Sequence, residues 1–136
     1  MTTFLVPGHI QPWQRTTGGR HTPKATREFQ AKVAMFAKSA GVKCIPAGTP
    51  VRLELTIIFP RPKKPTYPYP SQSDTSNTLK SVEDALNKVA YDDDRQITEG
   101  EQVKRFAMPT EDPGVWVTVK ALGGQGPERA TPDATE

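Results

Sequence analysis

Apolar residues recur at every second position from 51 to 59, with polar side chains between most of them. A period of two places alternate side chains on opposite faces of a β-strand, so this segment is predicted to be a strand with one buried face. Shorter patterns of the same kind predict strands at 4–10, 95–107 and 115–119. The apolar faces of these strands predict a sheet that packs on a core.

Two segments have the spacing of amphipathic helices instead. From Lys24 to Ala40, apolar side chains recur every three or four residues, and Gly41 follows as a stop signal. From Asn77 to Val89, a second apolar stripe lies opposite a narrow polar sector. That sector carries Ser76, Lys80, Glu83 and Asn87. We therefore expect two helices, the second with an organised polar face.

The length and composition limit the number of domains. The chain has 136 residues, 35% of them hydrophobic, which is enough for one modest core. We expect a single domain over 1–121 and a disordered tail over 122–136, where apolar residues are almost absent. No run of about 18 apolar residues occurs, so we expect no membrane segment and a cytoplasmic location. The single cysteine, Cys44, cannot form an intrachain disulfide, which fits a reducing compartment.

Charge is distributed unevenly along the chain, although the net charge is only +3. Residues 1–73 carry 11 Lys and Arg against two acidic residues, net +9, whereas residues 74–136 carry 7 against 13, net −6. A basic surface attracts a polyanion, and an acidic cluster repels one unless divalent cations lie between them. The combination favours a metal-dependent nuclease over the plainer interpretation of charge that serves only solubility.

The acidic residues bracket the second predicted helix. Asp74 comes just before it, and Asp92, Asp93 and Asp94 come just after it. If the next strand runs beside the strand or loop that precedes the helix, Asp74 and Asp94 converge as oxygen ligands for Mg²⁺. Carboxylate-bound Mg²⁺ activates water and neutralises charge that develops on a phosphate, and a nearby lysine stabilises the same charge. Lys80 is placed to do so.

The order of these residues resembles the signature of the RusA family of Holliday junction resolvases. Asp74, Asn77 and Lys80 are followed by Asp84-Ala85-Leu86 and then by Asp93-Asp94-x-Gln96-Ile97. Further similarity lies in Val6-Pro7-Gly8, Thr22-Pro23-Lys24 and Phe59-Pro60, so the resemblance covers about residues 4–120. It implies a mixed α/β (α+β) fold with a small mixed sheet and two main helices, assembled as an intertwined homodimer.

The resemblance also implies a function. It implies a Mg²⁺-dependent endonuclease, with Mn²⁺ as an alternative ion, that resolves four-way DNA junctions by paired symmetric nicks in recombination and repair. Such a chain is expected to be encoded by a bacterium or a phage. Carried over residue by residue, the metal-ligating carboxylates fall on Asp74 and Asp94, with Asp93 beside the second, and the catalytic lysine falls on Lys80.

One position departs from the family pattern. The family has a second aspartate two residues after the first, and this chain has Ser76 there. Ser76 could cap the helix while fewer acids suffice, Glu83 on the same helix face could supply the missing charge, or the chain could bind junctions with weak or no cleavage. We favour Glu83 as a fourth catalytic residue.

Basic and aromatic residues form the expected DNA-binding set. Eight cations are predicted to contact phosphates: Arg15, Arg20, Lys24, Arg27, Arg61, Lys63, Lys64 and Lys104. Trp13, Tyr67 and Tyr69 are candidates for stacking on splayed bases, although ordinary packing is the commoner role. The Pro-rich segment 60–70 leaves a third function open, an adaptor that binds proteins; strong salt dependence of DNA binding would argue against it.

Overall fold

The computed structural model describes residues 1–8, 24–70 and 75–123, with side chains of residues 25 and 75–77 left out. Two α-helices, a short 3₁₀ helix and four strands make up this part of the chain. In chain order they are β1 (Thr2–Pro7), α1 (Lys24–Ser39), β2 (Val51–Phe59), α2 (Thr75–Ala85), η2 (Asp94–Gln96), β3 (Ile97–Phe106) and β4 (Gly114–Ala121). The predicted disordered tail lies almost entirely outside the described residues.

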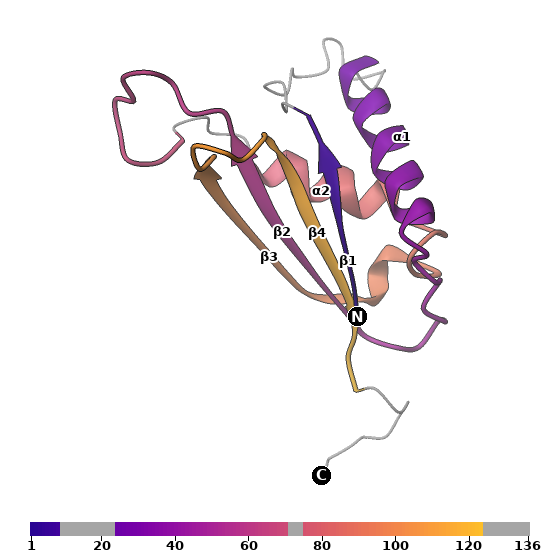
Figure 1. Cartoon of the computed structure of the whole chain (residues 1–136). Helices are drawn as coiled ribbons and strands as arrows, with labels where there is room; N and C mark the ends of the chain where they lie inside the picture. Colours follow the sequence, from indigo (N-terminus) through magenta and orange to yellow (C-terminus); the bar gives the residue numbers. More distant parts are fainter. Residues whose placement is uncertain (9–23, 71–74, 124–136) are drawn as a thin grey trace, which may run out of the picture.

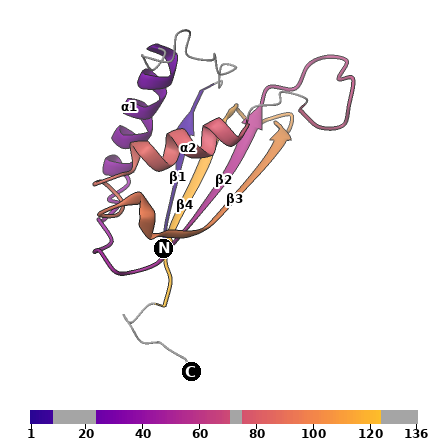
Figure 2. The same ribbon diagram turned by 180° about the vertical axis from the view of Figure 1, so that it is seen from behind.

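The four strands form one mixed sheet in the order β1-β4-β2-β3. β3 runs parallel to β2, whereas β4 pairs antiparallel with both β2 and β1. Both helices lie on the same face of the sheet, as the front and rear views show (Figures 1 and 2). The α+β fold with two helices and a small mixed sheet, expected from the sequence, is therefore confirmed.

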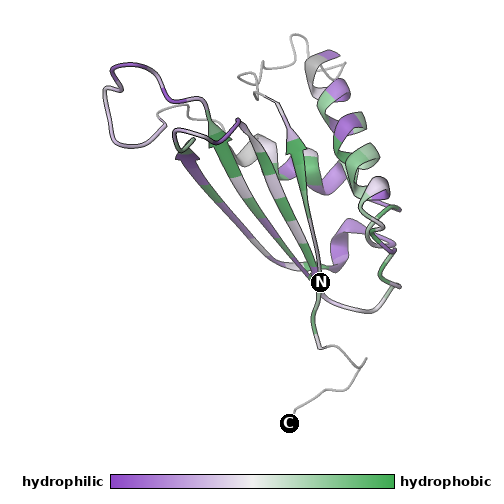
Figure 3. Cartoon of the chain, viewed as in Figure 1, coloured by the Kyte–Doolittle hydropathy of each residue, from purple (hydrophilic) through white to green (hydrophobic). Residues whose placement is uncertain are grey.

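The core lies between the helices and the covered face of the sheet. The alternation in β2 predicted this buried face, and the prediction is confirmed. Val51, Leu53, Leu55 and Ile57 are all at most 2% exposed. Val33 of α1 and Val82 of α2 pack onto them from the other layer. Burying an aliphatic side chain of this size contributes roughly 1.5–3 kcal/mol. Figure 3 shows the same alternation along β1, β2 and β4, whereas β3 is largely polar.

The second helix ends earlier than its apolar pattern predicts. α2 stops at Ala85, and the chain turns through residues 86–90 with Lys88 in the left-handed region at φ 70°. Leu86, Ala90 and Tyr91 are nonetheless fully buried. The helical spacing continues beyond the helix because these turn residues also pack into the core.

The other face of the sheet is not covered by any described element. Cross-strand pairing aligns Leu5, Trp116, Thr56 and Val103 in one row across all four strands. Trp116 is 40% exposed and Val103 47%. This row, the open-face row, is a band of partly exposed apolar surface. Within the described part of the chain, neither helix is long and apolar enough to cross a bilayer.

Candidate active site

Glu83 is a half-buried carboxylate on α2, one turn after Lys80. Residues three apart on a helix are neighbours, so the Lys80 ammonium lies beside Glu83. Burial raises the pKa of Glu83 above its usual value, Lys80 opposes this shift, and the charges of Asp94 and Asp84 add to it. The Glu83 and Asp94 carboxylates, eleven positions apart in the sequence, are therefore close enough to repel each other.

Tyr91 connects the end of α2 to the segment that carries Asp94. Its side chain is fully buried, and its hydroxyl donates a hydrogen bond of 2.7 Å to the backbone carbonyl of Glu83. The last carbonyls of a helix lack partners within the helix, so this bond satisfies one of them. Burial, followed by the nearby carboxylates of Glu83 and Asp94, raises the pKa of the phenol, which stays protonated as a donor. Sequence reasoning missed this positioning residue.

Asp93 holds the turn that presents Asp94. It is the N-cap of η2, and its carboxylate accepts hydrogen bonds from the backbone N–H of Arg95 at 2.9 Å and from the Arg95 guanidinium at 3.2 Å. These two donors lower the pKa of Asp93. Both of its oxygens thus already have protein partners. The neighbouring Asp94 is partly exposed, and its side chain lies beside that of Asp93.

Gln96 fixes η2 to the loop before β2. Its side-chain amide donates to the carbonyls of Pro46 at 2.9 Å and Thr49 at 3.0 Å, and more weakly to that of Ile45. Its side-chain oxygen accepts from the backbone N–H of Asp93 at 2.9 Å, which completes a capping box. The Gln of the sequence motif is therefore a structural clamp beside the acidic residues.

The donors fit a divalent cation only in part. Glu83 and Asp94 are hard oxygen donors of the kind that Mg²⁺ binds, and their mutual repulsion is what a cation between them would relieve. No group of three or more ligating side chains occurs within the described residues. Asp74 lies outside those residues, as does the side chain of Ser76, so the predicted convergence of Asp74 and Asp94 is not described.

Five of the predicted DNA-binding residues lie on two elements at one end of the molecule. Lys24 and Arg27 lie on the first turn of α1, where Lys24 is 4.0 Å from Glu28. Arg61, Lys63 and Lys64 are exposed on the loop after β2. Both groups lie at the same end in either view (Figures 1 and 2). Arg15 and Arg20 lie outside the described residues.

Lys104 lies on β3, two residues before Phe106, at the end of the strand next to the loop after β2. It pairs opposite the buried Ile57, which places it on the helix-covered side of β3. Seven residues separate it from Ile97 at the start of the strand, a rise of about 23 Å. Lys104 is therefore remote from Asp94 and suits a contact with DNA better than one with the reacting phosphate.

Two acidic side chains beside a lysine, on a small body with two basic groups at one end, are compatible with a protein that acts on nucleic acid phosphates. The comparison with known families identifies the family. The family model for endodeoxyribonuclease RusA matches residues 6–120, and the chain belongs to the RusA endodeoxyribonuclease family. Membership supports an endonuclease of the Holliday-junction-resolving class, as the sequence motif implied. The search of curated proteins gave no match.

Proposed function

We propose that this protein is a divalent-metal-dependent endonuclease that resolves four-way DNA junctions by paired symmetric nicks. The observation that carries the proposal is the match of the endodeoxyribonuclease RusA model to residues 6–120, and Glu83, Lys80 and Asp94 supply the local chemistry. Two carboxylates that repel each other in a half-buried site raise the free energy of the empty site, which favours cation binding. Family membership supplies the DNA substrate class.

Glu83, Asp94 and Asp74 are the residues that would hold Mg²⁺. The bound ion would supply a more acidic water and a counter-charge for the scissile phosphate. Glu83 would supply the charge that Ser76 lacks through a shifted ion or a bridging water, because two helical turns separate the two positions by about 10 Å. The Tyr91 hydroxyl holds the backbone carbonyl of Glu83. Asp93 and Gln96 hold the turn of Asp94 in place. Lys80 lies where it can stabilise negative charge on a phosphate oxygen.

The protein would act as a homodimer. A four-way junction has two similar strands related by a two-fold axis, so two active sites related by the same symmetry can cut both. The open-face row offers a partly apolar surface for the second copy, since Trp116 and Val103 are exposed on it. A symmetric dimer uses the same patch on both subunits.

A cleavage assay tests the proposal directly. Labelled four-way junction and linear duplex are incubated with Mg²⁺, Mn²⁺ or EDTA, with wild type, Asp94→Asn, and the exposed-loop variant Asp112→Asn as a matched control. We expect metal-dependent, symmetric nicks in the junction with wild type and Asp112→Asn, and none with Asp94→Asn. If the wild type binds the junction tightly but cleaves it with none of the metals, the nuclease proposal is wrong and the protein is a junction-binding protein.

A further inference from the structure

An open cavity lies at the end of the sheet opposite η2. It has a volume of about 390 Å³ and is formed by the loop after β2 together with Phe106 at the end of β3. Figure 1 shows this loop projecting beyond the ends of β2 and β3. β3 has ten residues and spans about 30 Å, so the cavity is far from Asp94 in the same subunit. A ligand in this cavity is therefore not the scissile phosphate of the same subunit.

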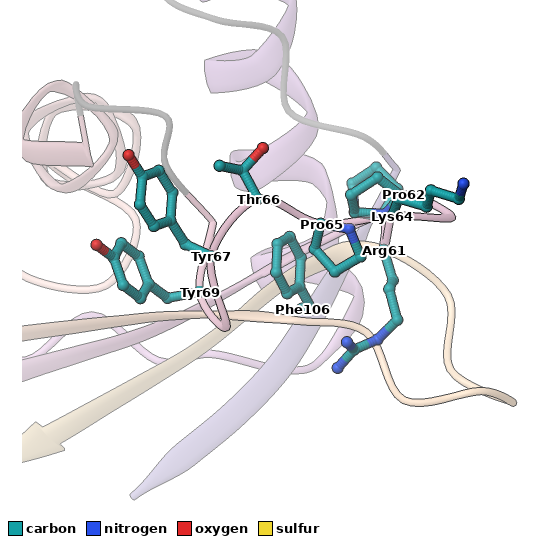
Figure 4. A pocket seen from close by; sticks show the side chains of 9 residues that line it. Arg61, Pro62, Lys64, Pro65, Thr66, Tyr67, Tyr69 and Phe106 are labelled. Carbon is teal, nitrogen blue, oxygen red and sulfur yellow. The ribbon is translucent and has the colours of Figure 1, made fainter.

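Two tyrosines form one wall of the cavity. The rings of Tyr67 and Tyr69 are stacked, with centroids 5.2 Å apart and an interplanar angle of 14°. They are 48% and 51% exposed, so the stacked pair is open to solvent. Figure 4 shows the pair on one side of Phe106, with both hydroxyl groups on the same side. An exposed aromatic stack of this kind is a platform for another flat ring.

The opposite wall is cationic. Arg61 and Lys64 line the cavity, and none of its nine lining residues is acidic. The Arg61 guanidinium lies 5.1 Å from the centroid of the Phe106 ring, and its Nε donates to the carbonyl of Ala107. Three prolines, Pro60, Pro62 and Pro65, restrict the backbone between the two walls. A restricted loop loses less entropy when it binds a ligand.

We propose that this cavity binds an unpaired DNA base, stacked on the Tyr67–Tyr69 pair, with the adjoining phosphate beside Lys64 and Arg61. Stacking platforms combined with cations are the usual way in which proteins hold single strands, because every base has a π-face. A base inside a continuous duplex cannot reach the rings, whereas a base at an interrupted stack can. The inference rests on the proposed function, which makes junction DNA the partner, and it assigns the cavity to substrate selection.

Binding measurements in EDTA test the inference without any cleavage step. The Kd of the full-length protein is measured for a short oligothymidylate, a four-way junction and a linear duplex of the same arm sequence. Tyr67→Leu/Tyr69→Leu removes the platform, and Tyr67→Phe/Tyr69→Phe keeps both rings. Loss of stacking on one base should weaken oligothymidylate and junction binding by about fivefold or more. Binding to the duplex should change much less, and the Phe variant should bind like the wild type.

Salt dependence separates stacking from charge. Tyrosine removal releases no counterion, so the slope of log K against log salt should stay unchanged in the Leu variant. Lys64→Gln should instead reduce the slope by about 1. Equal losses on duplex and junction, or no loss on oligothymidylate, would overturn the inference. Because the nuclease proposal is judged by wild-type cleavage in Mg²⁺, the two can fail independently.

Discussion

At the scale of single residues, Glu83 is the residue on which the proposed chemistry depends. Glu83→Gln keeps the shape of the side chain and removes the charge that couples to Asp94. Loss of outer-shell partners alone costs about 10–100-fold in metal-site function, so loss of a ligand should lower Mg²⁺-dependent cleavage by at least as much. Initial cleavage rates on a four-way junction, measured across Mg²⁺ concentrations, check this.

The control is the adjacent and exposed Asp84, since Asp84→Asn removes a carboxylate from the same helix without removing the proposed ligand. Adding Ser76→Asp to Glu83→Gln restores the family order of carboxylates and should recover part of the lost rate. If Glu83→Gln cleaves at the wild-type rate, Glu83 is not a ligand and Asp74 with Asp94 must suffice.

The sequence could predict where Lys80, Glu83 and Asp94 lie, because these placements are local: a helix face, and an acidic turn before a strand. The role of Tyr91 could not be predicted. Its hydroxyl reaches the carbonyl of Glu83 only because the chain leaves the helix at Ala85, and the apolar spacing gives no sign of that turn. Asp93 was predicted as a metal ligand beside Asp94, and its hydrogen bonds with Arg95 could not be predicted from the sequence.

At the scale of elements, Gln96 joins η2 to the loop before β2. Gln96→Ala removes donors from the carbonyls of Pro46 and Thr49 and an acceptor from the N–H of Asp93. A partly buried group left without its partner costs about 1–3 kcal/mol. We therefore expect the free energy of unfolding, measured in urea, to fall by this amount. Cleavage should also be slower, because Asp94 is less well held. Gln30→Ala, which removes one bond of 3.5 Å, is the matched control and should cost less. If Gln96→Ala is as stable as the wild type, Gln96 does not stabilise the contact between η2 and the loop before β2.

The end of β3 is tied to the following loop by a pair of charges. Arg105 donates to both carboxylate oxygens of Glu111, at 2.6 and 2.8 Å, and lowers the pKa of Glu111 to about 2. A carboxyl with a lowered pKa in the folded state stabilises the fold above its unfolded pKa, about 4.5, and this stabilisation is lost as the pH falls toward 2. Unfolding midpoints in urea should therefore fall more steeply over this range for wild type than for Glu111→Gln. Parallel pH profiles for the two proteins would show that the pair contributes nothing.

Among the elements, both ends of β2 were predicted correctly. One face of β2 is wholly buried, so its apolar residues follow a strict period of two. β3 was predicted less well. It lies at the edge of the sheet, most of its side chains are at least partly exposed, and its polar composition gives weak alternation. Its first three predicted residues include part of η2, because the cap formed by Asp93 stabilises a helical turn there.

At the scale of the whole molecule, the proposed dimer through the open face of the sheet would bring two active sites together. Trp116 lies in the middle of the open-face row, between Leu5 and Thr56. Trp116→Lys would bury a charge in the proposed interface, which is strongly unfavourable without a partner. We expect a dimer for wild type and a monomer for Trp116→Lys by sedimentation. Met108→Lys, which replaces an apolar residue that is 59% exposed outside this row, should remain dimeric.

Cleavage of a plasmid that contains a cruciform distinguishes a dimer from a monomer by its products. A dimer that cuts both strands within one encounter yields linear DNA, whereas a monomer that cuts one strand yields nicked circles, because the cruciform is lost when the first nick relaxes the supercoil. Trp116→Lys should therefore shift the product from linear to nicked while its nicking still requires Mg²⁺. If Trp116→Lys stays dimeric and produces linear DNA, the subunits meet through another surface. A monomeric wild type that yields linear DNA would remove the need for a dimer altogether.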